Sequence, residues 1–413
     1  MTETDPMTGT GFSMSRRTTM AAAAGALLAG AAPQAVAAPH GTAPTAPGRG
    51  RHALQADVDA VRATGATGVL AEVQTPHGHT TARAGVADLE SGRPVPWDAY
   101  YRIGSDTKTF TAVVALQLVG EGRLALTDTV ERWLPGAIRG NGNDGGRITV
   151  ANLLRQTSGL NDYVAVAEGE FTPEAYRKGR FRTHTPREQL AAALAKPPRW
   201  LPRRDAPAAE RRWGYANTNY VVAGLVIEAV TGRPWAQEVH ERIIEPLGLR
   251  HTLIPGTSPY VPQPTATAYT QFPGSKRLTD TTLAAVGGAD GALISTTRDH
   301  AVFLRALMAG RLLRPAQLAA MRRTVPAEDW IRAKGVRYGL GIAWRPVAGG
   351  GSGLWFHGGT HLGVVSESGV TEDGTRAVTT ATFTLRTDAT RQEAQDAATL
   401  RLVDNALRAG GGR

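Results

Sequence analysis

Cysteine is absent from this chain of 413 residues. The protein therefore cannot form disulfide bonds, thiolate zinc sites or iron–sulfur clusters, and it cannot use a cysteine nucleophile. Lysine is also scarce, because it supplies only five of the 46 basic side chains. A lysine within a chemical motif is therefore more informative here than it would be in an average protein.

Motifs of several enzyme classes are absent as well. The sequence contains no Gly-Lys dipeptide of a phosphate-binding loop, no His-Glu-x-x-His zinc motif and no Gly-x-Ser-x-Gly nucleophile elbow. Residues 140–145 match the letters of a dinucleotide-binding fingerprint, but no predicted strand precedes them, and we interpret them as a surface loop. His77 and His79 lie in a predicted turn without a third ligand, so a solvated turn is favoured over a metal site. We therefore expect a protein that holds neither a metal nor another cofactor.

The net charge is strongly positive, at +10. The arginines are nevertheless scattered, without the basic tail or the interleaved aromatic residues that are typical of nucleic-acid binding. The charge therefore predicts a basic surface, drawn at long range to an anionic cell envelope, and no nucleic-acid partner. With 42% hydrophobic and 20% charged residues, the composition is that of a soluble globular protein.

The first 37 residues have the three parts of an export signal. Arg16 and Arg17 precede an apolar run from Ala21 to Ala32, and a small-x-small cleavage pattern ends at Ala37. The apolar run of 12 residues is shorter than the roughly 20 that a membrane-spanning helix needs. We therefore expect a secreted protein without an integral membrane span. The arginine pair favours the twin-arginine route, with the general route as the alternative.

Periodicity predicts the organisation of the remaining chain. Residues 38–50 form a Pro/Gly-rich linker, and 51–413 form the folded domain. Helices and strands are predicted near both ends, with a helix-rich middle. This arrangement predicts an α+β fold, in which an antiparallel β-sheet is flanked by the terminal helices and a helical lobe is inserted. The α/β part is expected at about 51–125 and 285–410, and the helical lobe at about 126–284. The helices are expected at 52–62, 105–119, 150–155, 218–230, 235–247, 295–310 and 392–408, and the strands at 68–73, 80–87, 338–344, 353–356, 362–366 and 377–385.

A Ser-x-x-Lys pair opens the predicted buried helix at 105–119. The spacing places the hydroxyl of Ser105 and the ammonium of Lys108 on one helical face. The free N–H groups of a helix N-terminus stabilise an oxyanion that forms beside the serine. A desolvated lysine loses part of its preference for the charged form and can act as a base. Alone, such a pair is common by chance.

Two further segments strengthen the hypothesis of a catalytic serine. Tyr215 and Asn217 precede a predicted helix, where a tyrosine hydroxyl can relay a proton and an amide can orient a carbonyl. The segment His357-Gly358-Gly359-Thr360 follows a predicted strand. Its glycines let a substrate backbone approach the strand edge closely. A packing tyrosine and an ordinary, partly buried histidine are the alternatives for Tyr215 and His357.

With these three motifs in order, the sequence resembles the serine β-lactamase-like, penicillin-recognising family, in its class C β-lactamase and D-alanyl-D-alanine carboxypeptidase branch. The resemblance spans about residues 52–408 and includes four flanking segments. Those segments are Tyr101–Gly104, Leu153–Leu160, Glu245–Leu249 and Gly291–Thr296.

The resemblance implies a role for each motif. Ser105 would be the acylated nucleophile, Lys108 the base that activates it and Tyr215 the proton relay, whereas Asn217 would orient the substrate amide. The backbone N–H groups of Ser105 and Thr360 would form the oxyanion hole, and His357, Gly359 and Thr360 would shape the substrate-binding strand edge. No glutamate can be given the deacylating role of class A enzymes.

One position departs from the carboxypeptidase pattern. Peptidases of this branch can carry a basic residue for the substrate carboxylate where this chain has Ala343, and we expect Arg345, on the same sheet face, to substitute. The sequence thus predicts a secreted D-alanyl-D-alanine carboxypeptidase acting on cell-wall peptides through a Ser105 acyl-enzyme. An esterase or β-lactamase of the same fold, or an inactive penicillin- or peptide-binding protein, is the alternative.

Overall fold

A computed structural model describes residues 48–166, 171–203, 212–285, 287–328, 330–331, 333–347 and 353–408. The predicted signal peptide lies outside these residues, as does most of the predicted linker. Residues 48–50 of that linker are helical, because helix α1 spans Gly48–Ala63 and so begins four residues before the predicted start at His52.

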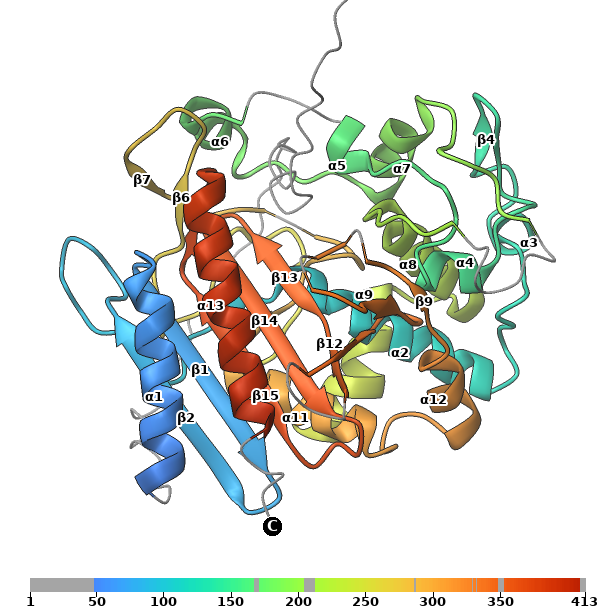
Figure 1. The fold of residues 1–413 in the computed structure, drawn as a ribbon. Helices are drawn as coiled ribbons and strands as arrows, with labels where there is room; N and C mark the ends of the chain where they lie inside the picture. The colour runs from blue at the N-terminus through green and yellow to red at the C-terminus, as the bar shows by residue number, and fades with distance from the viewer. Residues whose placement is uncertain are drawn as a thin grey trace, which may run out of the picture.

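A nine-stranded antiparallel sheet is the centre of the fold (Figure 1). Its strands follow the order β2-β1-β15-β14-β12-β11-β10-β9, and β13 lies beside β14. The N-terminal hairpin therefore joins the C-terminal strands, with Val69 opposite Thr382. The strands are β1 Gly68–Thr75, β2 Gly78–Gly85, β9 Val325–Pro326, β10 Arg337–Tyr338, β11 Ala343–Pro346, β12 Gly353–Phe356, β13 Gly358–His361, β14 Val364–Thr371 and β15 Ala377–Thr382.

The two terminal helices cover one face of the sheet. Helix α1 and helix α13, Ala389–Arg408, lie side by side across it (Figure 1). Val58 and Val61 of α1 and Leu402 of α13 are buried against Val69 and Val378 of the sheet. Burial of these apolar side chains is the main force that holds the helices on the sheet.

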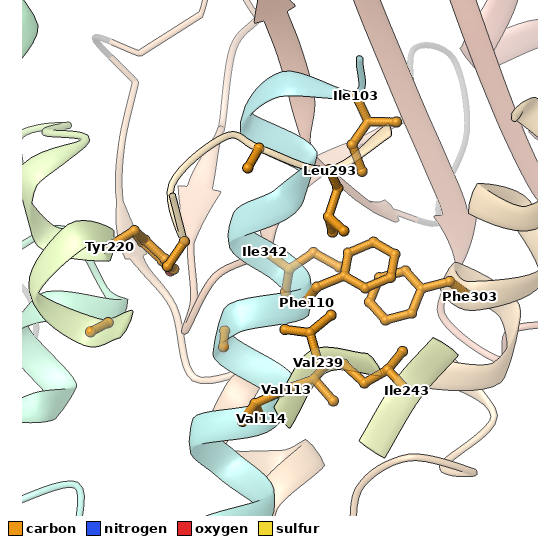
Figure 2. Close-up of a cluster of buried hydrophobic side chains, with 14 of the residues drawn as sticks. Ile103, Phe110, Val113, Val114, Tyr220, Val239, Ile243, Leu293, Phe303 and Ile342 are labelled. Carbon is orange, nitrogen blue, oxygen red and sulfur yellow. The ribbon is translucent and has the colours of Figure 1, made fainter. Parts of the chain in front are cut away.

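The opposite face carries the largest hydrophobic cluster. Helix α11, Thr297–Met308, lies on this face, and helix α2, Thr107–Gly120, is buried beside it. Phe110 of α2 and Phe303 of α11 stack with their ring centroids 3.6 Å apart (Figure 2). Because α2 is surrounded by protein, apolar residues occupy nearly all of its faces, as predicted for 105–119.

The central part of the chain is mostly helical. Helices α3, α4, α7 and α8 gather on the side of the sheet away from β1 and β2 (Figure 1). The remaining helices are α3 Val130–Trp133, α4 Val150–Leu154, α5 Tyr163–Val166, α6 Pro173–Gly179, α7 Pro186–Leu194, α8 Thr218–Thr231, α9 Trp235–Val239, α10 Glu245–Leu247 and α12 Pro315–Met321, with a 3₁₀ turn η1 at Gly104–Asp106 and a π turn η3 at His240–Ile244. Short strand pairs complete the fold: β3 Tyr101–Arg102 with β8 Ile294–Ser295, β4 Arg139–Gly140 with β5 Asn143–Asp144, and β16 Thr384–Leu385 with β6 Tyr269–Gln271 and β7 Leu278–Asp280.

This architecture confirms the predicted α+β class. Two predicted strands are divided in the structure. The strand expected at 338–344 becomes β10 and β11, because the chain reverses at Gly341, where a Cβ atom would lie 2.3 Å from Cβ of Ala112. The strand expected at 377–385 ends at Thr382, and β16 leaves the main sheet to pair with β6. Within the described ranges, none of the helices combines the length and the apolar character needed to cross a membrane.

Candidate active site

The turn η1 presents Ser105 directly before helix α2. Gly104 has a positive φ of +54°, and a Cβ atom there would lie 2.8 Å from the backbone oxygen of Thr360. A Cβ atom on Gly359 would lie only 1.8 Å from the backbone oxygen of Ile103. These two glycines allow η1 and β13 to meet backbone to backbone. The contact brings the Ser105 turn against the predicted strand edge.

Lys108 lies one helical turn after Ser105 and is fully buried. Its Nζ atom lies 2.9 Å from Oγ of Ser105, 2.7 Å from Oδ1 of Asn217 and 2.6 Å from the backbone oxygen of Asp290. Burial lowers the pKa of Lys108 to about 8, against the opposing attraction of nearby carboxylates. A neutral form of this lysine is therefore accessible close to neutral pH, as a general base requires.

Tyr215 lies over the same ammonium group. Its ring centroid is 5.0 Å from Nζ of Lys108. Burial raises the pKa of Tyr215 well above its usual value, whereas a hydrogen bond with Ser105 acts in the opposite direction. The tyrosine therefore keeps its proton at neutral pH and lies within hydrogen-bond reach of Ser105.

Asn217 connects the lysine to a carboxylate. Its Oδ1 atom accepts from Lys108, and its Nδ2 atom donates to Asp162 over 3.1 Å. Asp290, the other neighbour of Lys108, accepts a hydrogen bond from Tyr163 through its carboxylate. Burial raises the pKa of both Asp162 and Asp290. The structure thus brings Ser105, Lys108, Tyr215 and Asn217 into one hydrogen-bonded group.

His357 lies just before β13, but its ring is completely buried. Its Nε2 atom lies 3.0 Å from the hydroxyl of Tyr338, and its Nδ1 atom lies 2.8 Å from the backbone oxygen of Gly358. His357 therefore supports the strand edge from behind, whereas Gly359 and Thr360 meet the Ser105 turn directly.

Arg345 lies away from the catalytic group, so the structure does not bring it together with the other predicted site residues. Its side chain forms a buried ion pair with Asp404 of helix α13, with Nη1 and Oδ1 2.7 Å apart. Arg345 does share a sheet face with Ala343, but that face is the one covered by the terminal helices, since Ala343 belongs to the same hydrophobic cluster as Leu402. The guanidinium is therefore unavailable for a substrate carboxylate at the catalytic group.

Sequence reasoning missed an aromatic stack beside Tyr215. Trp330 stacks on the Tyr215 ring at 5.6 Å and meets the His357 ring edge-on at 5.1 Å. Trp213 lies 6.1 Å from Trp330, and both tryptophans remain partly accessible. Trp213 could have been noted from its closeness to Tyr215 in the sequence, whereas no motif surrounds Trp330. In the part of the chain that the structure describes, no three His, Asp or Glu side chains form a group able to hold a metal ion.

Comparison with known proteins places the chain in a family. The Beta-lactamase family model matches residues 51–403. The chain belongs to the Beta-lactamase family. Proteins that the chain is similar to include penicillin-binding proteins, an esterase and a D-stereospecific amidohydrolase.

Three relatives illustrate the range. The structure of a D-stereospecific amidohydrolase from Streptomyces sp. is 38% identical, with a TM-score of 0.73, over 81% of this chain and 94% of that one. Esterase EstB from Burkholderia gladioli is 33% identical over 50% of this chain and 53% of its own length. Penicillin-binding protein 4 from Amycolatopsis lactamdurans is 29% identical over 41% of this chain and 40% of its own length. The chain therefore spans only about half, or less, of these two curated relatives.

Proposed function

We propose that this protein hydrolyses small amides of D-configured amino acids through an acyl-enzyme on Ser105. The observation that carries the proposal is the position of a buried lysine with a lowered pKa, 2.9 Å from the serine hydroxyl. A serine is a weak nucleophile until a base removes its proton, and Lys108 is the base within reach.

The reaction follows from this group. Neutral Lys108 takes the proton of Ser105 as Oγ attacks the substrate carbonyl carbon, and the oxyanion forms between the N–H groups of Ser105 and Thr360. Tyr215 gives its proton to the departing amine as the C–N bond breaks and is reprotonated with the proton that Lys108 holds, which leaves the acyl group as an ester on Ser105 and Lys108 neutral again. Water then attacks the ester with the same proton relay in reverse, and the free acid and the Ser105 hydroxyl are restored.

Two observations support an amide without a terminal carboxylate as the substrate. Arg345 is committed to Asp404, so strand β11 offers no cation for the terminal carboxylate of a peptide. The D-stereospecific amidohydrolase is matched over nearly its whole length, at 38% identity. The partly accessible rings of Trp213, Tyr215 and Trp330 offer an apolar surface for a side chain of the acyl group.

D-alanyl-D-alanine carboxypeptidase activity is the second candidate. It is supported by the likeness to penicillin-binding proteins and by the order of the three motifs. Esterase activity, supported by the likeness to EstB, needs the same nucleophile and a better leaving group. An inactive binding protein is the remaining alternative, but it would not need the complete group of Ser105, Lys108 and Tyr215.

The test is turnover of a matched panel by the wild type and by Ser105→Ala. The panel contains D- and L-phenylalanine amide, a D-Ala-D-Ala peptide acid, a p-nitrophenyl ester and a cephalosporin. The proposal expects the D-amide to have the highest kcat/KM among the amides and peptides, with all turnover lost in Ser105→Ala. Faster turnover of the peptide acid would favour the carboxypeptidase, and turnover of the ester alone would favour the esterase. No turnover of any substrate and no labelling by penicillin or a fluorophosphonate would favour the binding protein.

We also propose that the protein is exported. Support comes from the three-part signal in residues 1–37, and the net charge of +10 favours weak association with an anionic envelope. Replacing Arg16 and Arg17 with lysine should trap the precursor inside cells if the twin-arginine route is used. Undiminished export of that variant would indicate the general route, and a wild-type protein retained in the cytoplasm would refute export.

A further inference from the structure

Asp106 lies beside the nucleophile and is almost fully buried. Its Oδ2 atom lies 2.6 Å from Oγ of Ser366, and its Oδ1 atom lies 2.9 Å from Oγ of Ser368. Both serines belong to β14 and face the turn η1, although they follow Asp106 by some 260 residues in the chain. The mechanism proposed above does not use Asp106.

The two serines also contact the backbone that forms the site. Oγ of Ser366 lies 3.1 Å from the backbone oxygen of Ile103 and 3.4 Å from that of Gly359. Oγ of Ser368 lies 2.7 Å from the backbone oxygen of His357. Asp106 is therefore the centre of a hydrogen-bonded cluster that joins the nucleophile turn to both ends of the strand-edge motif.

The proton count in this cluster favours a neutral carboxylic acid. Each serine hydroxyl has one proton to donate but several oxygen acceptors within reach. An ionised Asp106 would bring two more acceptor oxygens and no proton, so some acceptors would stay without a donor. A protonated Asp106 supplies one more donor, which allows Ser366 or Ser368 to donate to a backbone carbonyl.

The surroundings favour the same protonation state. Burial raises the pKa of Asp106 to about 8, Glu367 adds to this effect, and Lys108 and the serine contacts oppose it. His300, whose Nε2 atom is 3.5 Å from Oδ1, is itself held neutral because burial lowers its pKa to about 3. The buried Tyr101, another neighbour, keeps its proton because its pKa is raised well above 10.

We propose that Asp106 is a positioning residue, a neutral acid that holds the turn of Ser105 against strand β13 through Ser366 and Ser368. Its effect on the reaction is indirect. By holding the turn, it maintains the relative position of the Ser105 and Thr360 N–H groups that face the oxyanion. This inference rests on the proposed role of Ser105 as the nucleophile.

Comparison of Asp106→Asn with Asp106→Ala shows whether Asp106 acts through its hydrogen bonds or through a negative charge. The asparagine is neutral, has almost the same shape and can still donate to a serine, so its kcat should stay within about 3-fold of the wild type. The alanine should lower kcat by about 10- to 100-fold, somewhat less than the loss of an oxyanion donor itself, with little change in KM. Ser366→Ala should show a weaker effect of the same kind, and it serves as the second variant if Asp106→Ala does not fold.

The measurement is the rate of covalent labelling by a fluorophosphonate, together with kcat and KM on the best substrate and a thermal unfolding check. A failure of wild-type labelling would overturn the proposed function itself. If the wild type is labelled, two outcomes would overturn the positioning role alone. One is unchanged kcat in folded Asp106→Ala and Ser366→Ala, and the other is an Asp106→Asn variant as slow as Asp106→Ala, which would show that the carboxylate charge is needed.

Discussion

At the scale of a single residue, two opposing effects set the pKa of Lys108. Burial favours its neutral form, and the nearby carboxylates of Asp290 and Asp162 favour its charged form. The charged form donates to all three oxygen atoms around Nζ, whereas the neutral form can donate to Asn217 and to the backbone oxygen of Asp290 while it accepts from the Ser105 hydroxyl. The result is a base placed by geometry, with a pKa near the working pH of a hydrolase.

Lys108→Ala should remove nearly as much activity as Ser105→Ala, about 10³-fold or more in kcat, because the two groups act as one unit. Lys178 is exposed on α6, and Lys178→Ala provides a matched control that should leave kcat unchanged. Initial rates on the best substrate compare the variants. Near wild-type activity in Lys108→Ala would contradict the assignment of the base.

The pH dependence of acylation follows from the same residue. Since the base must be neutral, kcat/KM should fall about tenfold per pH unit below the pKa of Lys108 and level off above it. With that pKa lowered to about 8, the rise should be centred near pH 8. A profile of kcat/KM measured with a neutral substrate would test this, and a rate independent of pH between 6 and 9 would contradict it.

At the scale of elements, the site depends on the approach of η1 to β13. Gly104 and Gly359 place no side chain between the two backbones, and the hydrogen bond between Ser366 and Asp106 lies beside this contact. The catalytic serine and the strand edge are therefore positioned by one interface between segments far apart in sequence.

Gly359→Ala should separate these two elements, because the new Cβ atom would otherwise lie 1.8 Å from a backbone oxygen. Displacing the Thr360 N–H group should lower kcat by about 10²-fold. Gly50→Ala is a suitable control, since Gly50 lies in helix α1 with open space at its Cβ position. The measurement is kcat of the two folded variants. Equal kcat values would contradict the prediction, because they would show that β13 can shift without loss of activity.

The ion pair between Arg345 of strand β11 and Asp404 of helix α13 contributes to stability. Arg345→Met would leave Asp404 buried without its partner and should destabilise the protein by about 3 kcal/mol, as breaking a buried ion pair does. Removing Asp404 as well, by Asp404→Leu, should recover part of that loss. Denaturant unfolding measures both effects.

In folded Arg345→Met, kcat/KM for a peptide acid and for a neutral ester should change equally little. A selective loss on the peptide acid would restore the carboxylate-binding role that the sequence suggested for this arginine.

At the scale of the whole molecule, the sequence could predict features that have a local pattern, but not features that depend on packing between distant segments. The buried helix α2, the terminal helices and the catalytic motifs have strong local signatures, and the structure contains these elements with the motif residues together. The face of Arg345 depends on which helix covers β11, and the partners of Asp106 come from a strand 260 residues later. Such features arise from tertiary packing, which periodicity does not encode.

The same division explains the missed parts of the site. Trp330 lies in a segment without a motif, and only the folded chain brings it onto the ring of Tyr215. The reversal at Gly341 likewise depends on tertiary packing, since a Cβ atom there would lie 2.3 Å from Cβ of Ala112 in α2.

The most direct test of the account is to identify the labelled residue after exposure to a fluorophosphonate, by intact mass and peptide mass spectrometry of the full chain. The account predicts one adduct per chain, located on Ser105, absent from Ser105→Ala and formed at least about 10³-fold more slowly in Lys108→Ala. An adduct on another residue, or equal labelling of Ser105→Ala, would contradict it.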